Sequence, residues 1–421
     1  MTGVADPPDE TAAFAEVMEA LGRYADETGA EPLMLGGWEA EHPAIAPPPG
    51  LLPRMSERAF DLRRYTYASD LRRAREEAAE LLADALRFAG APLTGRHVSL
   101  QQNSTQALLL SLAALKERGA RRVVIAAPAY YAAETICRSL GLEVVIAPAS
   151  DFLTGALDIP RLCAAARLPG SVALVTNPAY SLGVEYTPAQ ISALASDLPP
   201  HAWLLLDETR LGLHWRYPEP WYHAELSPRS IVIRSPSKIF FIHGRKISLL
   251  FGDPALLGEI ERLGEALVGS LSGDAESVAL AYLGAWRAWR DETAAGDTGP
   301  HTGAMLRWRA EILAVLRRNL ATAQTALAPA GFQISPVHSG PYALAAAPRE
   351  RLPRLAPMEA ARQGVLLMDA RYFLHEHPDW WGFRINLCCS SQHLSEALIR
   401  LQAVWRPAGQ IAAITGSWQG A

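Results

Sequence analysis

The stretch from residue 230 to residue 238 reads Ser-Ile-Val-Ile-Arg-Ser-Pro-Ser-Lys. Its apolar first half predicts a short buried strand, and its second half places two hydroxyls and Lys238 just beyond that strand. His243, Arg245 and Lys246 follow closely. A lysine beside hydroxyls and further cations suits an aldehyde cofactor that is held by a Schiff base and carries a phosphate. Serines next to an exposed lysine are also common in surface loops, so the rest of the chain must distinguish a cofactor site from an ordinary loop.

Composition limits the class of protein. The chain has 421 residues, of which 49% are hydrophobic, and this predicts two domains with a large core. A net charge of −5 argues against a nucleic-acid partner. No uninterrupted apolar run is long enough for a membrane span, and the acidic start lacks the pattern of a signal peptide, so we expect a soluble, cytoplasmic protein. No metal site is expected, because no metal-ligand spacing links the cysteines. These are Cys137, Cys163, Cys388 and Cys389.

Helical and extended segments alternate along the chain, which predicts an α/β fold with a mainly parallel sheet. Helical spacing is clear over residues 71–82 and 106–115. Residues 43–50 and 290–300 are rich in turn residues and are predicted to be exposed loops. Short apolar runs that predict buried strands lie at residues 122–126, 172–176, 203–206, 230–233 and 248–251.

The alternation of helical and extended segments ends at about residue 275. A helix-rich stretch is followed by two strand candidates, at residues 342–344 and 383–387. We therefore expect a large α/β domain over residues 60–275 and a smaller α+β domain over residues 276–421. Residues 1–59 are predicted to form an N-terminal segment that packs with the small domain.

Polar residues gather where the predicted strands end, which is where open parallel sheets bind ligands. Ser104 begins an apolar helix, and hydroxyls and free N–H groups at a helix N-terminus can bind a phosphate. Simple N-capping by Asn103 or Ser104 is the alternative. Ser235, together with a cation at Arg245 or Lys246, would complete the phosphate site.

Two further side chains suit a flat, charged ring. Tyr130 follows a predicted strand and can stack on such a ring, or else it simply packs in the core. Asp207 ends an apolar strand, where a carboxylate is costly unless it is paired. A protonated pyridine nitrogen would be such a partner. An aspartate there would keep the nitrogen protonated, so that the ring can accept electrons. Capping of a turn is the alternative for Asp207.

In this order and spacing, the residues resemble the class I and class II aminotransferases of the fold-type-I pyridoxal-phosphate enzymes, from about residue 65 to about residue 401. The resemblance implies a mainly parallel seven-stranded sheet between helices, pyridoxal 5′-phosphate as cofactor, and a homodimer. It implies that Lys238 forms the internal aldimine, Asp207 pairs with the pyridine nitrogen and Tyr130 stacks on the ring. The phosphate site would contain Ser104, Thr105, Ser235 and Lys246, with Tyr65 reaching the cofactor of the partner subunit.

The resemblance also places the substrate. Arg384, in the sequence Gly-Phe-Arg-Ile-Asn-Leu, corresponds to the arginine that binds the α-carboxylate with both arms of its guanidinium. Gly37 and Trp38 are assigned to the substrate side of the site, and Asn177 to the cofactor side.

Several positions depart from the family pattern, among them Asp369-Ala370, which replaces a Pro-Gly pair. Tyr180 stands where an asparagine usually bonds the 3′-oxygen of the cofactor, Arg210 where a tyrosine does so, and Lys246 where an arginine usually binds the phosphate. A phenol and a guanidinium beside that oxygen would change the pKa of the aldimine. Arg210 could instead form a structural ion pair, and His243 could be a loop histidine rather than a proton shuttle.

The function that follows is a reaction of an amino acid through external aldimine and quinonoid, with transamination as the first hypothesis. A non-transaminating enzyme of specialised metabolism, catalysing elimination, replacement, cyclisation, decarboxylation or oxidation by dioxygen, is the alternative with the same cofactor. A cofactor-free binding or regulatory module on the same fold is the alternative from another class. The sequence does not identify the substrate side chain.

Overall fold

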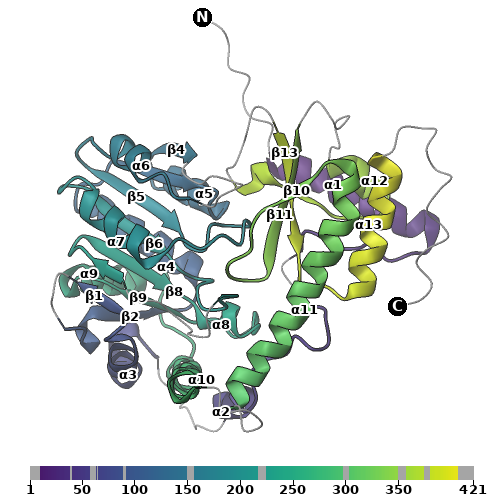
Figure 1. The fold of residues 1–421 in the computed structure, drawn as a ribbon. Helices are drawn as coiled ribbons and strands as arrows, with labels where there is room; N and C mark the ends of the chain where they lie inside the picture. The colour runs from purple at the N-terminus through teal and green to yellow at the C-terminus, as the bar shows by residue number, and fades with distance from the viewer. Residues whose placement is uncertain are drawn as a thin grey trace, which may run out of the picture.

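The computed structural model shows two lobes (Figure 1). The larger lobe holds β5, β6 and β8, and the smaller lobe holds β10, β11 and β13. The structure describes residues 10–37, 40–56, 63, 65–88, 92–148, 156–216, 224–296, 303–348, 357–373 and 380–405.

Within the described residues, the larger lobe is built on a seven-stranded sheet with the order β2-β9-β8-β6-β5-β3-β4. β9 runs antiparallel to both of its neighbours, and the other adjacent pairs are parallel. The predicted mainly parallel sheet is therefore confirmed. The strands are β2 (Val98–Gln101), β3 (Arg122–Ala127), β4 (Glu143–Pro148), β5 (Ser171–Thr176), β6 (Trp203–Asp207), β8 (Ser230–Arg234) and β9 (Ser248–Phe251).

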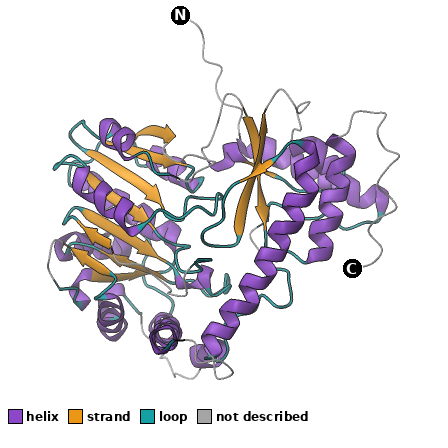
Figure 2. Cartoon of the chain, in the orientation of Figure 1, coloured by secondary structure: helices purple, strands orange, loops and turns teal. Residues whose placement is uncertain are grey.

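Successive residues of the central strands point into two separate cores, as expected for a sheet that is covered on both faces. In β3, Val123 and Ile125 belong to one core, whereas Val124 and Ala126 belong to the other. Figure 2 shows the strands lying between helices. The first core is covered by α4 (Ser104–Glu117), α5 (Ala132–Ser139) and α9 (Pro254–Leu267), and the second by α3 (Arg72–Leu82), α6 (Ile159–Ala165), α7 (Pro188–Asp197) and α10 (Ala275–Ala295).

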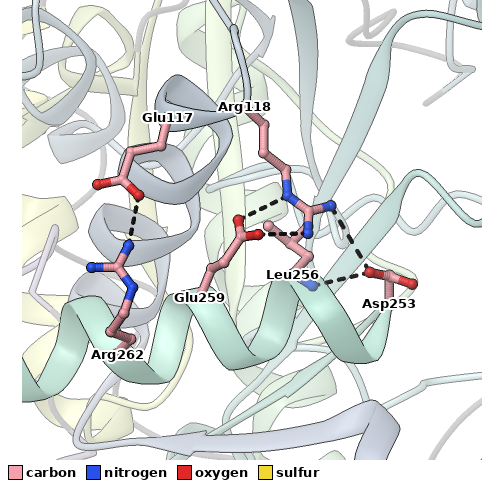
Figure 3. A network of polar contacts seen from close by, with 6 residues as sticks. All are labelled: Glu117, Arg118, Asp253, Leu256, Glu259 and Arg262. Carbon is pink, nitrogen blue, oxygen red and sulfur yellow. Dashed lines mark hydrogen bonds and ion pairs between the residues drawn. The ribbon is translucent and has the colours of Figure 1, made fainter.

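Ion pairs join the end of α4 to α9 (Figure 3). The guanidinium of Arg118 donates to both carboxylate oxygens of Glu259, at 2.8 and 2.9 Å. Arg262 donates to Glu117 at 2.8 Å. Because these side chains are partly exposed, each pair adds only about 0–1 kcal/mol of stability. They hold the carboxyl end of α4 in place, at the opposite end of the helix from Ser104.

The smaller lobe contains an antiparallel sheet with the order β10-β11-β13-β12. Both strand candidates of this region are confirmed. The strands are β10 (Gln333–Ile334), β11 (Tyr342–Pro348), β12 (Met368–Asp369) and β13 (Trp380–Asn386), and the helices are α11 (Ala304–Leu327), α12 (Pro357–Arg362) and α13 (Ser391–Trp405). A separate parallel pair, β1 (Leu86–Phe88) and β7 (Ala224–Leu226), lies in the larger lobe.

The N-terminal segment contributes two helices. α1 (Glu10–Thr28) packs against α12, with Val17 and Leu21 in one cluster with Ala361. α2 (Leu51–Ser56) contacts α10 instead. The domain limits given by the sequence stay a prediction.

The loop predicted over residues 290–300 is partly wrong, because α10 continues to Ala295. Glu292 explains the longer helix, since its carboxylate accepts hydrogen bonds from the backbone N–H groups of Met305 (2.8 Å) and Leu306 (3.1 Å) in α11. The last turns of α10 are thereby tied to the start of α11. Residues 297–300 lie outside the described part of the chain.

Candidate active site

A pocket opens at the carboxyl ends of β5 and β6. Six predicted site residues meet there, whereas Thr176 and Thr209 were missed by the sequence analysis. The pocket is lined by Ser104, Tyr130, Thr176, Tyr180, Asp207, Thr209, Arg210 and Lys238.

Lys238 provides the amine of this pocket. It lies in the short helix α8 (Pro236–Ile239), which follows β8 directly, and its Nζ is 5.8 Å from the ring centre of Tyr130. Burial, followed by the charge of Arg210, lowers the pKa of Lys238 from 10.5 to about 7, and Asp207 acts in the opposite direction. Near neutral pH a large share of the amine is therefore uncharged and able to act as nucleophile or base.

An aromatic cluster anchors the segment that carries Lys238. Phe240 is fully buried two residues later, and its ring lies 6.0 Å from that of Tyr282 and 5.7 Å from that of Trp308. The hydroxyl of Tyr282 donates to the carbonyl oxygen of Arg245 at 2.6 Å. The lysine loop is thus packed against α10 and α11, which limits its movement.

Asp207 lines the pocket and caps its own turn at the same time. Its Oδ1 accepts hydrogen bonds from the backbone N–H of Thr209, at 3.0 Å, and from the hydroxyl of Thr209. Asp207 therefore caps its turn, as the alternative interpretation expected, and its carboxylate still lines the pocket. Thr209 orients the acid, and a hydroxyl two residues after Asp207 was the available sequence signal.

A buried ion pair stands behind Asp207. Oε2 of Glu208 lies 2.8 Å from Nε and 2.7 Å from Nη2 of Arg234, and both side chains are inaccessible to solvent. The backbone N–H of Glu208 also donates to the carbonyl oxygen of Ile233, at 2.8 Å. These contacts join the end of β6, which carries Asp207, to the end of β8, which leads into the helix of Lys238.

The start of α4 forms another wall of the pocket. Oδ1 of Asn103 accepts a hydrogen bond from the backbone N–H of Gln106 at 2.9 Å, so Asn103 is the N-cap and Ser104 stands in the first turn. The hydroxyls of Thr105 and Tyr130 are 3.2 Å apart. The other free N–H groups of this turn remain available to an anion.

Ser235 is buried beside the pocket but is not one of its lining residues. Its hydroxyl donates to the carbonyl oxygen of Ile247 at 2.9 Å and lies 3.0 Å from the hydroxyl of Ser237. In this arrangement Ser235 holds the two ends of the lysine loop together.

The cations of the loop after Lys238 differ in their partners. Arg245 forms an ion pair with Asp274. Lys246 is exposed, and its charge contributes to the lowered pKa of Lys238. His243 is partly buried, and burial followed by nearby cations lowers its pKa to about 4, so its imidazole is neutral at neutral pH. Arg245 and Lys246 were the two candidates for binding the phosphate, and of these Arg245 is paired with Asp274 whereas Lys246 is not.

Arg210 lies against aromatic rings rather than an acid. Its guanidinium carbon is 4.5 Å from the ring centre of Tyr342 and 5.9 Å from that of Tyr180. Within the described ranges it forms no ion pair, so the structural ion pair considered above is not seen there. Tyr180 itself packs between Tyr130, at 5.8 Å, and Phe373, at 5.4 Å.

Arg384 comes from β13 of the smaller lobe, is fully buried and is not among the residues that line the pocket. Its Nε and Nη2 donate to the carbonyl oxygen of Gly36 at 3.1 and 2.5 Å, and Nη2 also reaches that of Gly37 at 3.3 Å. Burial, as the largest cause, lowers the pKa of Arg384. Gly37 thus contacts Arg384 through its backbone, whereas Trp38 lies outside the described residues.

Asn177 and Tyr65 are also absent from the pocket lining. Asn177 is buried, and its Oδ1 accepts a hydrogen bond from the backbone N–H of Tyr186 at 2.9 Å, which shapes the loop that carries Tyr180. Tyr65 is 78% exposed, so it has no place in the pocket of its own chain.

Comparison with known proteins decides the family. The family model described as aminotransferase class I and II matches residues 57–401, which is most of the chain. The chain belongs to this family. It is a pyridoxal-phosphate-dependent, aminotransferase-like enzyme that acts on amino acids. No curated protein sequence matches the chain.

Solved structures of aminotransferases share the fold. A double mutant of aspartate aminotransferase from Thermus thermophilus is 17% identical, with a TM-score of 0.73 over 96% of this chain and 100% of that one. A probable N-succinyldiaminopimelate aminotransferase, also from Thermus thermophilus, is 19% identical, with a TM-score of 0.72 over 93% and 100%. YbdL from Escherichia coli, described as having a methionine aminotransferase function, is 16% identical, with a TM-score of 0.70 over 96% and 99%. The substrates in these descriptions differ, so the shared fold leaves the substrate open.

The residues of the pocket fit the cofactor of this aminotransferase family. The pocket combines an amine with a pKa near 7, a carboxylate for a ring nitrogen, and a helix N-terminus for a phosphate.

Among the described residues, no helix is long and apolar enough to cross a membrane.

Proposed function

We propose that this protein is an aminotransferase in which Nζ of Lys238 holds pyridoxal 5′-phosphate covalently and then moves the α-proton of the substrate. The observation that carries the proposal is the position of Lys238, whose pKa is about 7, in one pocket with Asp207. When bound, the cofactor draws electrons from the α-carbon of the amino acid, which makes the α-proton acidic. A base with a pKa near the working pH is well suited to remove it.

The remaining residues bind and orient. Asp207 would hold the ring nitrogen, and Tyr130 would lie against the ring face. Arg384, supported by the backbone of Gly36 and Gly37, would bind the α-carboxylate. The phosphate would be held by Ser104, Thr105, Ser235 and Lys246, and the ring oxygen would be approached by Asn177, Tyr180 and Arg210.

A homodimer is part of the proposal. Tyr65 is 78% exposed, and Leu267 and Val268, at 65% and 49%, are also exposed. Tyr65 lies close to these two residues in the fold, because Leu271 donates a backbone hydrogen bond to Thr66. Exposed apolar residues that gather in one region are typical of an interface. In such a dimer Tyr65 would reach the phosphate in the partner subunit. A cytoplasmic location stays a prediction.

The proposal is tested by trapping the cofactor. Purified protein is loaded with pyridoxal 5′-phosphate, its visible absorbance is recorded, and the complex is reduced with borohydride before peptide mass analysis. We expect the label on Lys238, and no visible band in Lys238→Ala. Lys246→Ala serves as the matched control, because it removes a neighbouring lysine and should leave the label on Lys238. A label on another lysine in the wild-type protein would refute the assignment.

The rate of cofactor loading should depend on pH with a midpoint near 7. Because only the uncharged amine attacks an aldehyde, and because the pKa of Lys238 is lowered to about 7, the rate should rise as pH increases through 7. Stopped-flow measurement of the visible band in the apoprotein, between pH 5 and 10 in buffers without primary amines, checks this. A rate that keeps rising up to the ordinary lysine pKa of 10.5 would show that burial does not act on Lys238 as proposed.

Tyr180 and Arg210 favour a second candidate, a non-transaminating reaction with the same cofactor. Both stand where the resemblance to the family implies other residues beside the ring oxygen, and both lie in the pocket. A panel of amino acids followed by visible absorbance separates the two. In an aminotransferase, an amino acid removes the visible band and a 2-oxo acid restores it. In the alternative, the product forms and the band returns without any 2-oxo acid.

A further inference from the structure

Tyr342 is buried at the junction of the two domains, yet it was not singled out by the sequence. It is the first residue of β11 and pairs with Asn386 of β13, so it lies diagonally across from Arg384 on the neighbouring strand. Side chains at such diagonal positions are within reach of each other when one is aromatic. The ring of Tyr342 is therefore held next to Arg384 by the register of the small sheet.

The backbone of Tyr342 is also fixed from the large domain. Gly183, in the loop that carries Tyr180, has a φ of +70°, and a Cβ added there would lie 2.4 Å from the carbonyl oxygen of Tyr342. Only glycine permits this backbone conformation and this close approach together. The loop of Tyr180 thus rests directly on Tyr342.

Two cations share the ring of Tyr342. The guanidinium carbon of Arg210, from the loop after β6, lies 4.5 Å from the ring centre, and that of Arg384 lies 4.6 Å from the same centre. An aromatic face attracts each cation, which offsets part of the repulsion between them. The ring therefore brings together one arginine from each domain.

The guanidinium of Arg210 has a side-chain hydrogen bond with Tyr342 and lies within reach of the charge of Asp207, but it has room for a further anionic partner. Its Nε is buried without a hydrogen-bond partner in the described residues, and it forms no ion pair there. A buried guanidinium without an ion pair is costly unless a ligand supplies the negative charge. Arg210 lines the pocket beside Lys238, where the substrate amino acid would bind.

We propose that Tyr342 is a positioning residue that holds Arg210 and Arg384 together as a two-arginine site for the carboxylate of the substrate. Arg210 lines the pocket, whereas Tyr342 and Arg384 do not, so Tyr342 acts through the guanidinium groups that it holds. This inference rests on the proposed function, in which Arg384 alone binds the α-carboxylate. There Arg210 approaches the ring oxygen of the cofactor; the inference gives its guanidinium a second partner, the carboxylate, and makes the Tyr342 ring the shared support.

The test compares a carboxylate with its uncharged isostere on the enzyme loaded with pyridoxal 5′-phosphate. Propionate and propionamide are titrated by calorimetry at about pH 7.5. The wild-type enzyme should prefer propionate by at least about tenfold. Tyr342→Leu and Arg210→Met should each reduce this preference by about tenfold, and the double variant should lose little more, because both changes disturb the same site. Tyr342→Phe keeps the ring but removes the hydroxyl that forms a hydrogen bond with Arg210, so it should lose less of the preference than Tyr342→Leu.

The control is Phe332→Leu, which removes a buried ring that packs on Phe383, at 5.5 Å, and on Trp381, at 6.5 Å. This variant should bind propionate as the wild type does. A preference that survives in Tyr342→Leu, or that is as weak in Phe332→Leu, would overturn the role of Tyr342. If Tyr342→Leu does not fold, an unchanged preference in Arg210→Met overturns the two-arginine site. Wild-type protein that takes up no cofactor would instead refute the proposed function.

Discussion

Glu208→Ala is expected to lower the free energy of unfolding by about 3–5 kcal/mol, because it leaves the guanidinium of Arg234 buried without its acid. Both side chains are inaccessible to solvent, and Oε2 of Glu208 is within 2.8 Å of two nitrogens of Arg234. The loss should be read from urea unfolding of the cofactor-free protein, followed by circular dichroism. The variant should also bind the cofactor more weakly, because the pair joins the strand ends that carry Asp207 and Lys238.

A matched control separates burial from ion pairing. Glu117→Ala removes an acid that also lies 2.8 Å from its arginine, Arg262, but these two side chains are 51% and 60% exposed. Water replaces the lost partner there, so the expected change is below about 1 kcal/mol. Equal losses for Glu208→Ala and Glu117→Ala would contradict the argument. Replacing Glu208 by Leu and Arg234 by Met together should restore much of the stability, because no charge is then left unpaired.

Asp207→Ala is expected to reduce the rate of reaction with an amino acid by about 10²–10⁴-fold, the range associated with losing a group that controls a proton. Without the carboxylate, the ring nitrogen of the cofactor is no longer kept protonated, and the α-proton becomes harder to remove. Single-turnover loss of the visible band, with the fastest amino acid of the panel, measures this. The variant should still carry the covalent label on Lys238, which distinguishes a catalytic loss from a failure to bind.

Thr209→Val is the comparison for Asp207→Ala. It keeps the acid and its bond to the backbone N–H of residue 209 but removes the hydroxyl that donates to Oδ1. Losing one hydrogen bond should slow the reaction by about tenfold or less. If Asp207→Ala reacts at the wild-type rate while fully loaded with cofactor, Asp207 does not have the proposed role.

Local pattern was sufficient for most of the central sheet. Strand β6, for example, is a short apolar run that ends at an acid, and this pattern alone predicts burial on both faces. Both edge strands, β2 and β4, were missed: β4 is partly exposed, so its pattern is weaker, and β2 is a run of four residues with two polar members. The end of α10 was misjudged because a contact made by Glu292 with the next helix outweighs the turn residues nearby.

By itself, the sequence determined the α/β pattern and the place of Lys238 just after a buried strand, because these depend on short runs of neighbouring residues, whereas the roles of the site residues rest on the resemblance to a family. Only the tertiary structure decided that Arg245 pairs with Asp274, that the pKa of Lys238 falls to about 7, and that Tyr342 supports two arginines. Each of these depends on burial and on distances between segments that are remote in sequence. The period of a helix or strand carries no record of such distances, because it specifies which face a residue occupies and not what packs against that face.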